Sequence, residues 1–176
     1  GTGDDTFIAS RGKDTIYGGT LDNSLVSGEI NTISYEDEEE NVIINLQEGK
    51  SGLNTNNGSN SISITNNSTL YEIQNAIGGA GDDIFISNAL VSNIFDGGDH
   101  KTKGDTVDYS NLNLSQAINV TLAGTTFADV IIGDGTIKKD SIKNIENVTG
   151  GAGNDIIVGD TLNNILRGGA GNDTIK

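Results

Sequence analysis

A nine-residue unit recurs along this chain, and its strict count constrains the fold more than any other feature. Written from Gly150, the unit reads Gly-Gly-x-Gly-x-Asp-x-apolar-x, and it returns in the same frame at Gly168. It also occurs intact at Gly78–Ile86 and, without its first letter, at Gly1–Ile8. Looser copies, with Asp or Asn in the sixth position, are found at Ala9–Tyr17, Gly18–Val26 and Gly159–Arg167. Self-similarity at a short fixed period is typical of a solenoid.

The eighth position of the unit is a large apolar residue in every copy. These residues are Phe7, Ile16, Leu25, Phe85, Ile157, Leu166 and Ile175. The glycines favour a tight turn, because they adopt backbone conformations closed to other residues. The three residues that follow the Asp then form a short strand whose middle side chain points inward. Two units make one flat coil, so residues 18 apart, such as Asp155 and Asp173, are expected to stack.

A second, longer period of about 75 residues separates the glycine-aspartate blocks. The blocks begin long repeats at about 1–77, 78–149 and 150–176, within a single predicted domain of residues 1–176. Between the blocks lie the inserts 31–77 and 105–149, in which β-branched or alternating runs predict strands. The predicted strands are Thr32–Tyr35, Asn41–Leu46, Ser61–Thr65, Thr106–Tyr109, Ala117–Leu122 and Asp129–Gly133. The sequence leaves open whether the inserts form extra coils or pack outside the solenoid.

Composition narrows the range of partners. The 176 residues include 25 acidic and 10 basic side chains, a formal net charge of −15. Such a charge repels nucleic acid and anionic membrane surfaces and attracts cations. The absence of cysteine excludes disulfides and thiolate zinc sites. No apolar run approaches the roughly 20 residues of a membrane span. Because the chain opens inside a motif, we interpret it as part of a longer protein.

The chemistry of the unit indicates a calcium site. Glycine turns can direct bare carbonyls toward one point, and the Asp of the sixth position adds a carboxylate there. Two carboxylates and several carbonyls from stacked turns form a hard, oxygen-only donor set, which suits Ca²⁺. Stacked carboxylates repel one another without a cation, so calcium is expected to stabilise the folded state, because the unfolded chain lacks the site. Folding is then expected where calcium is plentiful, outside the cell.

The tandem units "GGAGNDIIV", "GGAGNDTIK" and "GGAGDDIFI" resemble the RTX (repeats-in-toxin, haemolysin-type) calcium-binding nonapeptide. The resemblance implies an all-β fold, a right-handed parallel β-roll or β-helix, with the longer β-rich inserts between nonapeptide blocks. It also implies a bacterial protein, secreted or on the cell surface, that interacts with a type I secretion machinery during export. Several Ca²⁺ ions are implied, each held between one turn and the next turn but one.

Carried onto this chain, the resemblance assigns one complete site to the C-terminal block. Its ligands are Gly151, Gly153 and Asp155 together with Gly168, Ala170 and Asp173. Half-sites are expected at Gly1, Gly3 and Asp5, partnered by Gly18, Thr20 and Asn23, and further at Ser10, Gly12 and Asp14. Another is expected at Gly79, Gly81 and Asp83. Glu146 and Asn164, also 18 apart, are candidates for a weaker site on the opposite edge.

Other conspicuous residues have structural interpretations that we prefer. The acidic run Glu36–Glu40 is expected to be a solvated loop rather than an extra calcium site. The single histidine, His100, is expected to be an exposed loop residue. Asp129 and Asp134 are interpreted as turn residues rather than a catalytic pair, while Tyr35 and Tyr109 occupy equivalent places and are expected to pack within the inserts.

Three functional hypotheses follow. The first is a structural, calcium-responsive module of a large secreted or surface protein such as an adhesin or exoprotein, without enzymatic activity, since no nucleophile with a base and no phosphate loop is present. The second is a carbohydrate-binding or polysaccharide-modifying module, which an aromatic content of 5% without Trp disfavours. The third is the export and folding appendage of a toxin, protease or lipase.

Overall fold

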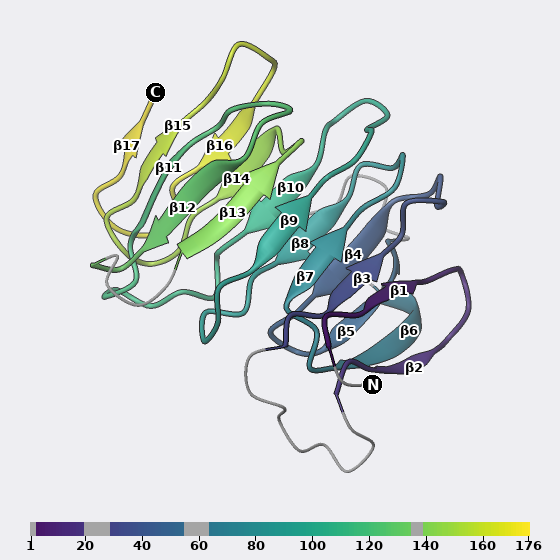
Figure 1. Cartoon of the computed structure of the whole chain (residues 1–176). Helices are drawn as coiled ribbons and strands as arrows, with labels where there is room; N and C mark the ends of the chain where they lie inside the picture. The colour runs from purple at the N-terminus through teal and green to yellow at the C-terminus, as the bar shows by residue number, and fades with distance from the viewer. Residues whose placement is uncertain (1–2, 20–28, 55–63, 135–138) are drawn as a thin grey trace.

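Short strands make up the regular structure of this computed structural model, which describes residues 3–19, 29–54, 64–134 and 139–176 (Figure 1). The strands are β1 (Thr6–Ile8), β2 (Thr15–Tyr17), β3 (Thr32–Ser34), β4 (Val42–Asn45), β5 (Lys50–Asn54), β6 (Ile64–Tyr71), β7 (Asn75–Ile77), β8 (Ile84–Ile86), β9 (Ile94–Asp96), β10 (Thr106–Asp108), β11 (Ile118–Thr121), β12 (Ala128–Ile132), β13 (Lys139–Lys143), β14 (Asn147–Thr149), β15 (Ile156–Val158), β16 (Ile165–Arg167) and β17 (Thr174–Ile175). In the described ranges no helix is long and apolar enough to cross a membrane.

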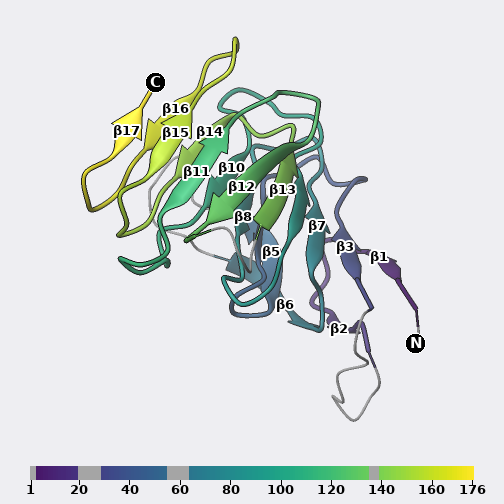
Figure 2. The ribbon, with the colours of Figure 1, turned by 60° about the vertical axis from the view of Figure 1, so that its left-hand side comes forward.

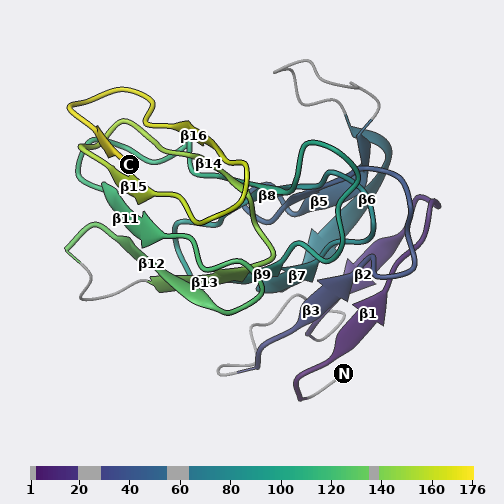
Figure 3. The same ribbon diagram turned by 90° about the horizontal axis from the view of Figure 1, so that it is seen from above.

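The strands form two sheets that face each other, as Figures 2 and 3 show. One sheet has nine strands in the order β1-β3-β7-β9-β13-β12-β11-β15-β17, and the other has eight in the order β16-β14-β10-β8-β4-β5-β6-β2. Within the nonapeptide blocks, successive strands alternate between the sheets and pair in parallel with the strand one coil away. The fold is therefore the all-β parallel roll that the sequence predicts.

The register in the C-terminal block confirms the predicted 18-residue spacing. Ile156 of β15 pairs with Thr174 of β17, and Asn147 of β14 pairs with Ile165 of β16. Each of these pairs is separated by two nonapeptides, so one coil holds one strand from each sheet.

The inserts extend the sheets and do not pack outside them. The first insert supplies the antiparallel meander β4-β5-β6 to the eight-stranded sheet, and the second supplies β11-β12-β13 to the nine-stranded sheet. Among the described strands, β5 and β12 alone run against their neighbours. Each meander thus begins and ends with strands that continue the parallel roll, which lets the nonapeptide blocks stack on both sides of it.

Equivalent parts of the two long repeats lie in opposite sheets. The segment β3–β8 corresponds in sequence to β10–β15, yet β3 belongs to the nine-stranded sheet and β10 to the eight-stranded one. The chain crosses between sheets an odd number of times from β3 to β10, so the second repeat is turned over relative to the first. Consequently, the glycine turn before β8 lies on one edge of the roll and the turn before β15 on the other.

The core is the layer of side chains between the sheets. Phe85 of β8 and Phe95 of β9 meet there across the two sheets, with ring centroids 5.4 Å apart, and neither is exposed. Tyr35 and Tyr109 are both buried, which confirms the expectation that they pack in the inserts. Each buried hydroxyl has a partner: Tyr35 Oη lies 2.8 Å from Ser51 Oγ, and Tyr109 donates to Asp140 Oδ2 at 3.0 Å.

Candidate metal centre

The glycine turn before β8 is closed by the carboxylate of Asp83. Asp83 Oδ1 accepts from the Val42 amide at 2.8 Å, and Oδ2 accepts from the Gly79 amide at 2.8 Å. The side chain is fully buried. One carboxylate therefore ties its own turn to β4 of the preceding insert.

The turn before β15 repeats this arrangement. Asp155 Oδ1 accepts from the Ile118 amide at 2.8 Å, and Oδ2 accepts from the Gly151 amide at 2.9 Å. Asp155 is also fully buried. These two of the three intact nonapeptides thus have the same local structure although they lie on opposite edges of the roll.

The glycine turns before β8 and β15 each lie between an insert loop and another turn. In the turn before β8, the Ala80 amide donates to the Glu38 carbonyl at 2.8 Å, and the Gly79 carbonyl accepts from the Asp99 amide at 3.0 Å. In the last block, the Ala152 amide donates to the Leu112 carbonyl at 3.1 Å. The turns are therefore interior layers of a stack, which places their Asp side chains out of contact with solvent.

The predicted partners in the last block lie in adjacent layers. The Asp155 amide donates to Asp173 Oδ1 at 2.9 Å, and the Ala170 amide donates to the Gly151 carbonyl at 2.9 Å. Turn 150–155 and turn 168–173, which contain Gly153 and Gly168, are therefore stacked as the spacing predicts. The assignment of their oxygens as calcium ligands stays a prediction.

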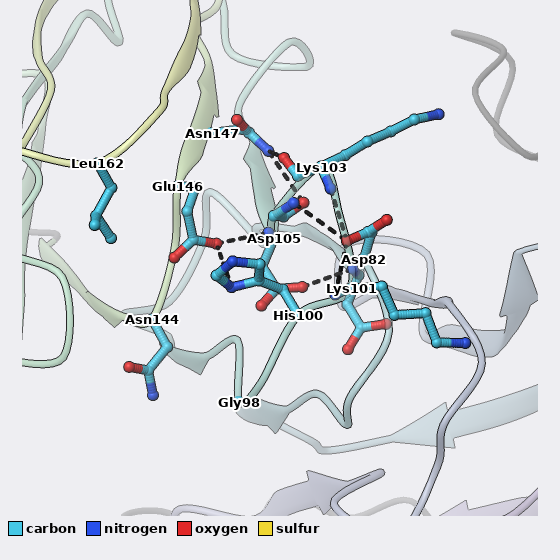
Figure 4. Close-up of polar contacts among 12 residues, drawn as sticks. Asp82, Gly98, His100, Lys101, Lys103, Asp105, Asn144, Glu146, Asn147 and Leu162 are labelled. Carbon is cyan, nitrogen blue, oxygen red and sulfur yellow. Dashed lines mark hydrogen bonds and ion pairs between the residues drawn. The ribbon is translucent and has the colours of Figure 1, made fainter.

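A column of three buried acids runs along the edge before β8, β10 and β14. The Asp83 amide donates to Asp105 Oδ1 at 2.7 Å, and the Asp105 amide donates to Glu146 Oε2 at 2.8 Å. Asp105 is fully buried and Glu146 is 5% exposed. The other Asp105 oxygen, Oδ2, is buried without a hydrogen-bond partner. Figure 4 shows this region.

The electrostatics of this column favour a bound cation. Burial raises the pKa of Asp105 to about 9, and the negative charges of Asp83 and Glu146 add to this increase. The hydrogen bond from the Asp83 amide acts in the opposite direction and lowers the pKa. Burial likewise raises the pKa of Asp83 to about 6, although the Val42 and Gly79 amides oppose it. Neighbouring carboxylates with an unpartnered buried oxygen offer hard donors, and these residues fit Ca²⁺.

Sequence reasoning missed the partner of Asp83. The loop 97–105 begins with Gly97 and Gly98, as a nonapeptide does, but its acid comes only at Asp105. Val107 of β10 pairs with Phe85 of β8, a separation of 22 residues instead of 18. The signal was the Gly-Gly pair followed by Gly-Asp directly before the predicted strand at 106–109.

The N-terminal half-site differs from the 18-residue pairing predicted for it. The Asp5 amide donates to Asn31 Oδ1 at 2.9 Å, and Thr6 of β1 pairs with Thr32 of β3, so the next layer comes 26 residues later. Asn31 therefore occupies the layer in which Asn23 was expected. Gly1, Thr20 and Asn23 lie outside the described residues, whereas Gly3 and Gly18 lie inside them.

The second N-terminal half-site stacks on the first insert. The Asp14 amide donates to Ser68 Oγ at 3.0 Å, and Thr15 of β2 pairs with Thr69 of β6. Ser10, Gly12 and Asp14 are exposed. A serine, not a second acid, is the layer neighbour of Asp14, so this half-site has no carboxylate partner among the described contacts.

Glu146 and Asn164 lie in adjacent layers, as their spacing predicts. Asn164 Nδ2 donates to the Glu146 carbonyl at 2.9 Å. The Glu146 carboxylate, however, faces the other neighbour, where it accepts from Asp105 and lies 3.5 Å from His100 Nδ1. The structure therefore groups Glu146 with the loop 97–105.

The sequence predicted a solvated loop for the acidic run, but the run is not uniformly solvated. Glu36, Glu39 and Glu40 are exposed, but Glu38 is 6% exposed and paired with Arg11, whose Nη2 lies 2.8 Å from Oε1. Burial alone would raise the pKa of Glu38, and hydrogen bonds from Arg11 and neighbouring amides outweigh it and lower the pKa. Glu38 is thus held by the previous coil.

The third glycine of the intact units before β8 and β15 stands against the insert backbone. A Cβ on Gly81 would lie 2.7 Å from Asn41 Cα, and one on Gly153 would lie 2.6 Å from Ala117 Cα. We therefore expect Gly81→Ala to destabilise the calcium-bound protein by about 1–3 kcal/mol in urea unfolding, the usual cost of overpacking. Gly12→Ala is the control, because its Cβ would meet only the Asp14 side chain, at 3.5 Å or more. Equal stabilities of the two variants would contradict this expectation.

These turns and their spacing define a parallel β-roll protein built from nonapeptide repeats. A family model for the RTX calcium-binding nonapeptide repeat matches residues 1–25 and 149–176, in four copies, so the chain carries RTX repeats. The turn 78–83 lies outside the match, yet it has the same geometry as turn 150–155.

Two metalloproteases are similar to this chain. Metalloprotease AprA of Pseudomonas entomophila (strain L48) is 45% identical over 83 residues, which cover 46% of this chain and 16% of that protein. Metallopeptidase AprA of Pseudomonas marginalis is 36% identical over 118 residues, which cover 66% of this chain and 19% of that protein. The chain thus matches less than a fifth of either relative's length.

Proposed function

We propose that this chain is a calcium-dependent folding segment of a larger secreted bacterial protein. The observation that carries the proposal is the buried column Asp83, Asp105 and Glu146, in which one carboxylate oxygen has no partner. Burying several carboxylates without a compensating cation is unfavourable. The RTX repeats that the chain carries support calcium as that cation.

Calcium, when bound, supplies the positive charge that the stacked carboxylates lack. The chain's own residues supply the frame. Asp83 and Asp155 close their turns through two amides each, and the insert loops hold the outer side of each turn. In low calcium the carboxylates repel one another and favour the unfolded chain, which suits export before folding.

Circular dichroism with and without calcium tests this function. At pH 7.5 the chain in excess chelator is expected to lack the β spectrum, and addition of Ca²⁺ to millimolar concentration is expected to restore it. Mg²⁺ at the same concentration is the control, because it keeps its waters and demands a tighter octahedral geometry. A chain that is equally folded in chelator would sink the proposal.

We further infer that the parent protein is an exoenzyme and that this segment is its non-catalytic appendage, exported by a type I machinery. The similarity to two metalloproteases favours an enzyme parent over an adhesin. The flanking sequence tests this: a catalytic domain on the same chain is expected, and tandem adhesion domains would refute it. Export of a reporter fused to the segment, with and without type I components, tests the route.

A further inference from the structure

We propose that His100, Asp105 and Glu146 form a binding site for a first-row transition dication, with Zn²⁺ as the best fit. The site takes two of its ligands, Asp105 and Glu146, from the acidic column of the proposed calcium function, and His100 is the ligand that makes it select zinc over calcium. The three side chains come from two layers of the roll: His100 and Asp105 from the loop 97–105 and Glu146 from the residue before β14. Figure 4 shows the His100 imidazole beside the Glu146 carboxylate.

The ligand atoms are close enough to share one ion. One atom from each side chain lies within 4.8 Å of the other two. His100 Nδ1 and Glu146 Oε2 are 3.5 Å apart. Two ligands of a tetrahedral zinc, each about 2.0–2.2 Å from the metal, are separated by roughly 3.3–3.6 Å. This pair therefore already has the separation that a shared zinc requires.

The acidic column lacks a positive charge at the same place. Asp105 is fully buried, and its Oδ2 atom has no hydrogen-bond partner. The imidazole is part exposed, at 40%, and so leaves a route to solvent. A carboxylate with a free oxygen, sealed from water on the protein side, is unfavourable unless a cation binds it.

The nitrogen ligand decides the type of metal. Ca²⁺ takes oxygen ligands almost exclusively, whereas imidazole with carboxylates suits zinc and its neighbours in the first transition row. His100, Glu146, Asp99 and Asn144 line one pocket, in which water can complete the coordination shell. The repeat spacing suggested that Glu146 shares a calcium ion with Asn164. The geometry instead assigns Glu146 to the zinc site.

The loop that carries His100 is held in place by a neighbouring acid. Asp82 Oδ1 accepts from four successive amides, Lys101 to Gly104, at 2.9–3.2 Å. Burial disfavours the charged form of Asp82, but these four donors outweigh it and lower its pKa. Asp82 is therefore a positioning residue. This loop carries the extra residues that interrupt the nonapeptide. Bound zinc would link it to the layer of β14.

Zinc titration of the whole 176-residue chain in saturating calcium tests the proposal. His100 is the single histidine, so one ¹⁵N imidazole signal reports the site. We expect one Zn²⁺ per chain by calorimetry, with a shift of the His100 ring nitrogens at the same stoichiometry. His100→Ala and Glu146→Gln are each expected to weaken zinc binding at least ten-fold.

The matched control is Glu36→Gln, which removes an exposed acid outside the site and is expected to leave zinc affinity unchanged. Calcium-induced dichroism of each variant without zinc reports whether it folds. His100→Ala leaves all three carboxylates of the column in place, so it keeps this test separate from that of the proposed calcium function. Unchanged zinc affinity in a folded His100→Ala variant, or an imidazole signal that zinc does not move, would overturn the site. Zinc that only displaces calcium, equally in wild type and His100→Ala, would overturn it too.

Discussion

Asp83→Ala is expected to destabilise the calcium-saturated protein by about 3 kcal/mol or more. The substitution leaves the amides of Val42 and Gly79 without their acceptor inside the roll. Each unsatisfied buried group costs about 1–3 kcal/mol. The variant also removes a carboxylate from the column that we expect to bind calcium. Urea unfolding in saturating Ca²⁺, followed by circular dichroism, measures the loss.

Two further variants separate the causes of that loss. Asp83→Asn keeps one acceptor oxygen but removes the charge, so it should need more calcium for folding while losing less stability at saturation than Asp83→Ala. Asp129→Ala is the surface control, because Asp129 is exposed and paired only with Lys139 at 2.8 Å; its cost should stay within about 0.5–1 kcal/mol. An Asp83→Ala variant as stable as Asp129→Ala would contradict the role of the buried carboxylate.

The part of the fold that the sequence predicted best is the part with uninterrupted units. From Gly150 to Lys176 nothing is inserted, so the count of 18 places Asp155 directly against Asp173. The sequence also predicted the insert strands β3, β4, β10, β11 and β12, which are β-branched or alternating runs, but it did not predict β5, β7, β13 and β14. The inward residues of two intact units follow the same logic, with Phe85 and Ile157 fully buried, whereas Ile175 of the last unit is 48% exposed.

Layer spacing failed as a guide wherever the chain between two layers is longer. Asp5 contacts Asn31 because β1 pairs with β3, whose residues come 26 positions later in the chain and not 18. Asp105 was missed for the same reason, since the coil from β8 to β10 carries four residues more than two intact units. A solenoid tolerates such loops at its edge, because the strand pairing that defines the coil is unaffected.

Contacts between coils were hidden from the sequence altogether. The burial of Glu38 depends on Arg11, 27 residues earlier, and no local pattern marks the pair. The meeting of His100 with Glu146 depends on the parallel pairing of β10 with β14, which sets residues 41 apart side by side. Such neighbours follow from the stacking of unequal coils, which repeat counting does not supply.

Lowering the pH is expected to fold the chain in the absence of calcium. The pKa of Asp83 is about 6 and that of Asp105 about 9 in the folded state, against an ordinary value of 3.8. Each carboxyl thus keeps its proton in the folded state over a range in which the unfolded chain has lost it. Their contribution to stability is complete below pH 3.8 and is lost as the pH rises through about 6 for Asp83 and about 9 for Asp105.

Circular dichroism and urea unfolding in chelator, from pH 8 down to about 4.5, check this expectation: β structure should appear on acidification. In calcium the dependence reverses, because protons compete with the ion, so the calcium midpoint for folding should rise as the pH falls from 7.5 to 5.5.

Acidification also reduces the net charge of −15, which by itself favours compaction. Asp105→Asn separates the two effects. Its amide resembles the protonated acid at every pH, so the calcium-free variant should be more stable than wild type at pH 7.5 and depend less on pH. If the calcium-free variant and wild type share one pH profile, general charge repulsion, and not the buried column, governs folding.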